Sequence, residues 1–166
     1  MTGNPDAYKA IKRQNIQKAG ELVPHMREII KKDKNPLFEA ARMAIAGNVI
    51  DFGIYDSVNI EKEVLHSLEQ KLTINDFDRF LKKLKAAKNI FYIGDNSGEA
   101  VFDKLFIEQI NKPVKFVVRS EPILNDITEA EARLIGIDEV AEIVSSGTSA
   151  PGNVINDCSL EFLEML

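Results

Sequence analysis

Three short β-rich runs alternate with helical or turn-like sequence in the second half of the chain, and this alternation constrains the fold more than any other feature. The runs are Ile90–Ile93, Val114–Val118 and Val140–Val144. Strands separated by helical segments are typical of parallel sheets, because a parallel connection has to cross over the sheet. We therefore expect an α/β fold with a Rossmann-like parallel sheet and flanking helices.

The first 86 residues predict an N-terminal helical bundle that precedes this sheet. Asn4 followed by Pro5 predicts the start of a first helix, which Pro24 should kink or divide. Asn35-Pro36 predicts the start of a second helix, and Gly47 is placed to end it. We expect a helical subdomain over residues 1–86 and an α/β metal-binding subdomain over residues 87–166.

Two more helices are expected in the bundle. Residues 60–72 carry apolar side chains on one helical face. Thr73 with Asp76 resembles a capping box before a fourth helix at Phe77.

Charge and hydropathy exclude several classes of protein. The 21 basic and 26 acidic residues are mixed along the sequence and give a net charge of -5. No basic block points to nucleic acid, and no apolar run approaches the roughly 20 residues that cross a membrane. Met1 begins a polar segment rather than a secretion signal, so we expect a cytoplasmic protein. The single cysteine, Cys158, has no partner for a disulfide.

The candidate site lies in the turn Gly94–Gly98, between the first β-rich run and a helix expected over residues 99–110. Asp126 follows the second run, 31 positions after Asp95, which is close to the ~30 residues of one strand, crossover helix and strand. Parallel strands with right-handed crossovers bring these carboxyl ends to one edge of the sheet. We expect Asp95, Asn96 and Asp126 to meet there.

These residue types suit metal-assisted phosphoryl transfer. Hard divalent cations prefer carboxylate and carboxamide oxygens, and a site with few protein ligands leaves positions for phosphate and water. The ion would withdraw charge from a phosphoryl oxygen and orient or acidify a water. Ser97, the N–H of Gly98 and Arg119 are candidates to hold the remaining oxygens.

Each motif also has a structural interpretation. Asp, Asn, Ser and Gly are ordinary turn residues, and residues 125–128 can simply cap a helix that begins near Glu129. Arg119 can be a surface ion-pair partner. His25, His66 and Cys158 lack partners at metal-binding or catalytic spacing and are interpreted as structural.

Two further loops are candidates for the same crevice. Residues 47–53 place Asn48 and Asp51 between two glycines, either as a helix end or as contacts to the metal's waters or the substrate. Residues 145–148 follow the last β-rich run, but their composition fits any loop.

Together these segments resemble the damage-control phosphatase family, once classed as domain of unknown function 89. The similar motifs occur in the family's order: Asp6-Ala-Tyr-Lys9, Ala46-Gly-Asn-Val-Ile-Asp-Phe-Gly53, Ile93-Gly-Asp-Asn-Ser-Gly-Glu99 with Phe102-Asp103-Lys104, Val118-Arg119, and Pro122-Ile-Leu-Asn-Asp-Ile-Thr128. The family consists of metal-dependent phosphatases acting on small phosphorylated metabolites.

The resemblance implies a helical bundle joined to a three-layer α/β domain. It implies that Asp95, Asn96 and Asp126 bind a divalent cation such as Mn, Ni, Co or Mg. Asn48 and Asp51 would lie nearby, and we place Glu99 in the substrate-binding set with Ser97, Gly98 and Arg119.

Two departures from the family bear on activity. Members usually extend further at both ends, including a Lys-Gly-rich phosphate-binding loop, so we expect a shortened member with an incomplete phosphate pocket. An exposed last strand would favour homo-oligomers. Glu131 stands where the family more often has aspartate.

Our main hypothesis is a divalent-metal-dependent phosphatase of small phosphorylated metabolites, such as sugar phosphates or damaged cofactor-related phosphates. One alternative is an S-adenosylmethionine-dependent methyltransferase, although the turn lacks that cofactor's denser glycine pattern. The other is a catalytically silent metal-binding fragment.

Overall fold

The computed structural model describes residues 4–48, 57–151 and 154–166. Their helices and strands are α1 (Lys9–Lys32), α2 (Pro36–Gly47), α3 (Ser57–Glu69), α4 (Phe77–Ala86), β1 (Ile90–Ile93), α5 (Ala100–Ile107), β2 (Val114–Val118), α6 (Glu129–Ile135), η2 (Ile137–Glu139), β3 (Glu142–Ser145), η3 (Ile155–Asp157) and α7 (Leu160–Met165). The expected α/β class is confirmed, with a helical first half and a parallel sheet in the second. None of the described helices has the length and apolar character to cross a membrane.

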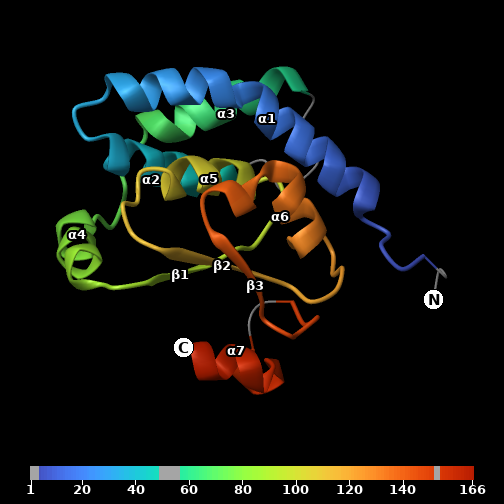
Figure 1. The fold of residues 1–166 in the computed structure, drawn as a ribbon. Helices are drawn as coiled ribbons and strands as arrows, with labels where there is room; N and C mark the ends of the chain where they lie inside the picture. Colours follow the sequence, from blue (N-terminus) through green and yellow to red (C-terminus); the bar gives the residue numbers. More distant parts are fainter. Residues whose placement is uncertain (1–3, 49–56, 152–153) are drawn as a thin grey trace.

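The three strands form one parallel sheet in the order β1-β2-β3. Five helices, α1, α2, α3, α5 and α6, lie on one side of this sheet, and α7 lies on the other (Figure 1). Ile93 is level with Val117, and Val118 is level with Ser145. All three strands therefore end at the same edge, as the crossover argument predicts.

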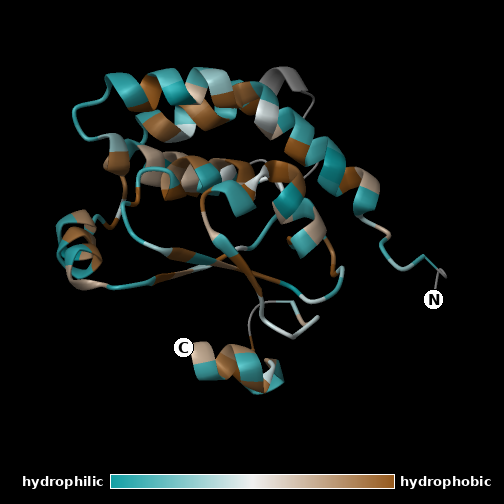
Figure 2. Cartoon of the chain, viewed as in Figure 1, coloured by the Kyte–Doolittle hydropathy of each residue, from teal (hydrophilic) through white to brown (hydrophobic). Residues whose placement is uncertain are grey.

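The main core fills the space between the helices and the sheet. It joins Met43 of α2, Phe102 of α5 and Phe116 of β2 in one cluster of buried side chains. Figure 2 shows the apolar stretches of α2 and α5 beside those of the strands. A smaller cluster on the opposite face packs Phe162 of α7 against Val117 and Val144. The boundary near residue 86 stays a prediction.

Two glycines allow close packing near the carboxyl edge. A Cβ atom on Gly94 would lie 2.6 Å from Cζ of Phe116, and one on Gly47 would lie 3.0 Å from Cδ2 of Phe102. Gly94 thus lets the chain leave β1 directly over the core, and Gly47 lets the end of α2 approach α5.

The expected start of the first helix is wrong. Asn4 accepts a hydrogen bond from the N–H of Asp6 at 3.1 Å and so forms a turn, and α1 begins only at Lys9. Pro24 does not divide α1, which continues to Lys32. Burial of residues on both sides of the proline, such as Ala19 and Met26, outweighs a loss of about 3 kcal/mol.

Three other predictions of where a helix or strand begins or ends differ from the structure in smaller ways. Asp76 makes no side-chain capping bond, and Asn75 accepts from the N–H of Phe77 instead. The helix expected over 60–72 ends at Glu69. The third strand begins two residues late, because the N–H groups of Val140 and Ala141 bond to Ile137 in the η2 turn.

The second helix starts and ends as predicted. Asn35 accepts a hydrogen bond from the N–H of Phe38 at 3.3 Å, with Pro36 in the first turn. Gly47 is the last residue of α2.

Candidate active site

Two loops meet at the carboxyl edge of the sheet and hold each other by backbone hydrogen bonds. The N–H of Ser97 donates to the carbonyl of Asn125 at 3.0 Å, and the N–H of Ile127 donates to the carbonyl of Asp95 at 2.8 Å. Asn96 and Asp126 are bridge partners between these loops. The structure therefore brings Asp95, Asn96 and Asp126 together, although their binding of a metal stays a prediction.

Arg119 is the cation at the centre of this cluster. It is 2% exposed, and its Nε donates to Oδ2 of Asp126 at 2.8 Å. Its Nη2 lies 3.6 Å from Oδ1 of Asp95, whose side chain is 59% exposed. Arg119 is thus a buried partner of both carboxylates rather than part of a solvated surface pair.

The pKa of Asp126 is raised from its ordinary value, mainly because burial disfavours the charged carboxylate. The hydrogen bond and charge of Arg119 act in the opposite direction, and the charge of Asp95 raises the pKa further. The ammonium of Lys12 lowers it. Asp95 thus places negative charge next to the buried carboxyl of Asp126, and an added cation would offset that charge.

Asn96 is buried, and its amide nitrogen points to two other oxygens. It lies 3.4 Å from Oδ1 of Asn48 and 3.5 Å from Oε2 of Glu99. Because the amide nitrogen acts as a donor in these contacts, the carbonyl oxygen is the atom that the prediction assigns to the metal. Asn48 at the end of α2 and Glu99 at the start of α5 are therefore placed beside the predicted ligands.

The other predicted contacts differ in their placement. The hydroxyl of Ser97 donates to the carbonyl of Asn125 at 3.1 Å, so this side chain ties the two loops together. Gly98 is buried in the turn before α5. Asp51 lies outside the described residues.

The residues present fit a hard divalent cation by their chemistry. Among the described residues, no group of three or more His, Cys, Asp and Glu side chains is arranged to hold a metal. The predicted set instead has two carboxylates and one carboxamide, Asp95, Asp126 and Asn96. Each carboxylate uses one oxygen for Arg119 and keeps a second, and such oxygen-only sets are typical of sites for magnesium or manganese.

The capping interpretation of residues 125–128 is also correct. Thr128 and Glu131 form a capping box at the start of α6. The loop therefore caps a helix and carries Asp126 to the edge of the sheet at the same time.

Two groups of buried polar side chains near the site were not predicted. Lys12 of α1 is 0% exposed and pairs with Asp6 and Glu131. One feature of the sequence could have indicated this group. Lys12 lies on the same buried helical stripe as Ala19 and Met26, where an apolar residue is expected.

The second group is a pair of side chains that joins β1 to α5. The hydroxyl of Tyr92 donates to Oδ1 of Asp103 at 2.5 Å. Burial raises the pKa of Asp103 well above its ordinary value, against the opposing effect of this hydrogen bond. The charges of Glu99 and Asp95 raise it further, so this carboxyl lies within electrostatic reach of the site.

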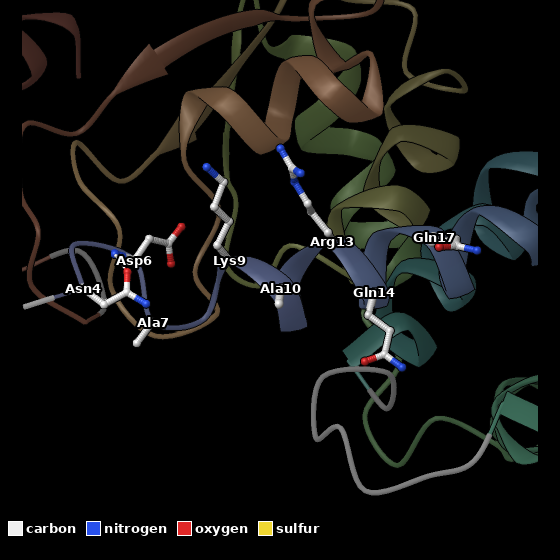
Figure 3. Close-up of a pocket in the computed structure, with 8 residues that line it drawn as sticks. All are labelled: Asn4, Asp6, Ala7, Lys9, Ala10, Arg13, Gln14 and Gln17. Carbon is white, nitrogen blue, oxygen red and sulfur yellow. Dashed lines mark hydrogen bonds between the residues drawn. The ribbon is translucent and has the colours of Figure 1, made fainter. Parts of the chain in front are cut away.

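A hollow beside the N-terminal part of α1 lies apart from the junction of the Asp95 and Asp126 loops. Asn4, Asp6, Ala7, Lys9, Ala10, Arg13, Gln14 and Gln17 line it (Figure 3). The side chains of Lys9 and Arg13 extend to the same side of the helix. Among the predicted site residues that the structure describes, none lines this hollow.

The family model described as damage-control phosphatase ARMT1-like domain matches residues 1–166. The chain belongs to this family. The resemblance inferred from the motifs is therefore confirmed.

Three similar proteins come from archaea. The chain is 37% identical to an uncharacterized protein of Methanocaldococcus jannaschii, over 99% of the chain and 57% of that protein. It is 35% identical to a damage-control phosphatase of Pyrococcus horikoshii, over 98% of the chain and 57% of that protein. A damage-control phosphatase of Archaeoglobus fulgidus is 32% identical, over 95% of the chain and 57% of that protein.

A crystal structure of a DUF89 family protein from Pyrococcus horikoshii has a similar fold. The TM-score is 0.85 at 34% identity, over 98% of the chain and 57% of that structure. The chain thus spans little more than half the length of the relatives it matches.

Proposed function

We propose that this chain contributes the metal-binding part of a divalent-metal-dependent phosphatase that hydrolyses small phosphorylated metabolites. The observation that carries the proposal is the junction of Asp95, Asn96 and Asp126 around Arg119, in a family named for phosphatases. That relationship favours a phosphatase over the methyltransferase alternative. Mn, Ni, Co and Mg are the candidate ions.

Asp95, Asn96 and Asp126 would hold the ion, which when bound supplies positive charge next to the phosphoryl oxygens. Arg119 would not bind the ion. Its guanidinium would direct both carboxylates to the same place, and it would add fixed positive charge beside an anionic substrate.

Glu99 and Asn48 would act around Asn96. Both accept from its amide nitrogen and so fix which of its atoms faces the ion. Ligand-orienting contacts of this kind are worth about 10- to 100-fold in metal affinity or activity.

The proposal is tested with the purified chain, para-nitrophenyl phosphate and a panel of sugar phosphates and cofactor-derived phosphates, each with Mn, Ni, Co or Mg. We expect turnover that needs a metal and is lost with a chelator. Asp95→Ala should lower it by about 100-fold or more, a typical loss on removing a metal-site ligand or its support.

Asp78→Ala is the matched control, because this exposed carboxylate lies on α4 away from the site. It should leave turnover unchanged. Hydrolysis that persists in the chelator and in Asp95→Ala would rule the proposal out. Binding of Mn without any hydrolysis would instead favour the catalytically silent fragment.

A further inference from the structure

Lys12 is a cation in the protein interior that the proposed chemistry does not use. It is 0% exposed, although lysine is almost never fully buried unless it is paired. Its Nζ lies 2.9 Å from Oδ2 of Asp6 and 3.0 Å from Oε1 of Glu131. Both contacts are ion pairs by distance, without the alignment of a hydrogen bond among the described residues. Burying such a group costs desolvation free energy, which its contacts have to offset.

Glu131 connects Lys12 to the first turn of α6. One carboxylate oxygen faces Lys12, and the other accepts from both the backbone N–H and the hydroxyl of Thr128. The N–H bond is 3.2 Å long. The ammonium therefore fixes the rotamer of the carboxylate that caps this helix.

Thr128 in turn belongs to the loop that carries Asp126. It is the bridge partner of Arg119, and the N–H of Arg119 donates to the carbonyl of Ile127 at 3.0 Å. The side chain of Arg119 then holds Asp126. A continuous set of polar contacts thus runs from the first turns of α1 to a predicted metal ligand.

We propose that Lys12 is a positioning residue, which acts through Glu131 to fix the Asp126 loop against the Asp95 loop. The proposal rests on the proposed function only in that Asp126 ligates the metal. Asp6 completes the arrangement by tying the turn before α1 to the same ammonium.

The test uses the full chain with Lys12→Met, Glu131→Gln and the double variant. Lys12→Met keeps the length of the side chain and removes the charge, and Glu131→Gln keeps its shape. The double variant removes both charges, so neither is left buried alone. Lys9→Met is the matched control, because this exposed lysine loses the same charge from the same end of α1.

The first measurement is hydrogen exchange without metal. We expect the N–H groups of Ile127 and Ser97, which join the two loops, to exchange about tenfold faster in Lys12→Met and in Glu131→Gln. Amides in the middle of α2 should keep their rates. The second measurement is Mn binding by calorimetry, where we expect affinity to fall by about tenfold or more, as for other residues that orient a metal ligand.

The control should change either quantity by no more than about twofold. Because Lys12 and Glu131 act in one set of contacts, the double variant should not exceed the sum of the single effects. Unchanged exchange at Ile127 and Ser97 in a folded variant would overturn the positioning role. If wild-type chain bound no Mn while exchange responded as expected, the positioning role would stand and the proposed function would fail.

Discussion

The carboxyl edge of the sheet and the hollow beside α1 both gather polar side chains, but only the edge buries and cross-links its charges. At the edge, Arg119 is 2% exposed and bonded to Asp126. In the hollow, Lys9 and Arg13 are exposed, and neither forms an ion pair with a described residue. A recess by itself therefore gives weaker support for a functional site than charged groups that are held in fixed positions, as they are at the edge.

Asp6 connects the two regions. It lines the hollow, and its carboxylate pairs with buried Lys12. Substitutions made in parallel in the two regions can therefore show where the boundary between them lies.

The largest expected effect comes from replacing the central cation. Arg119→Met leaves the buried Asp126 carboxylate without its partner and should lower the free energy of unfolding by about 3–5 kcal/mol. Arg13→Met in the hollow should change it by no more than about 0.5 kcal/mol. Urea unfolding of both variants measures the two values, and equal losses would contradict the distinction between the regions.

A second pair compares a glycine at the carboxyl edge with a glycine further along α1, beyond the hollow. Gly94→Ala at the edge forces a Cβ atom against the ring of Phe116 and should cost about 1–3 kcal/mol. Gly20→Ala in α1 meets no atom within 4 Å and should stabilise the chain by about 0.5–1 kcal/mol, because alanine is the better helix former. Thermal unfolding should give shifts of opposite sign. A stable Gly94→Ala protein would show that the edge is less tightly packed than described.

The third prediction concerns pH. The pKa of Asp103 is raised in the folded state, mainly by burial, so the folded protein binds a proton that the unfolded chain releases above about pH 4. The free energy of unfolding should therefore fall as pH rises from about 4 towards the raised pKa. Asp103→Asn should remove most of this slope in urea titrations at several pH values, and exposed Asp78→Asn should leave it unchanged. A slope that survives in Asp103→Asn would assign it to another group.

The smallest effect is expected in the hollow itself. Replacing Lys9 and Arg13 by Met should change the KM for phosphorylated substrates by no more than about twofold, because their exposed side chains are screened by solvent. A larger rise in KM, with kcat unchanged, would show that this recess binds part of the substrate.

Local patterns predicted the elements better than their ends. The run Ile90–Ile93 and the cap at Asn35-Pro36 were predicted correctly, because both depend on residues close in sequence. The start of α1 was not, since the Asn4 side chain takes the N–H of Asp6 and the Asp6 carboxylate is held by Lys12. Pro24 remained within α1 because burial on both sides stabilises the helix. The periodicity of apolar residues contains no information on such side-chain contacts or on burial in the folded protein.

The candidate site shows the same difference between what local patterns predict and what tertiary contacts add. Its candidate residues could be found from turn chemistry and strand order, but Lys12 and Asp103 could not be assigned to it, since each lies among buried helical residues that are mostly apolar. Likewise, turn chemistry did not predict that the hydroxyl of Ser97 donates to the carbonyl of Asn125, and its contact with a phosphate stays a prediction.

The amino-acid sequence by itself determined the α/β class, the family and which oxygen-bearing residues follow the ends of the strands. These follow from spacing of three to thirty residues, where chain geometry limits the possible structures. The burial of Arg119 between two carboxylates and the ion pair of Lys12 in α1 with Glu131 in α6 became visible only in the folded structure. Those contacts depend on burial and on distances across the fold, which no local pattern records.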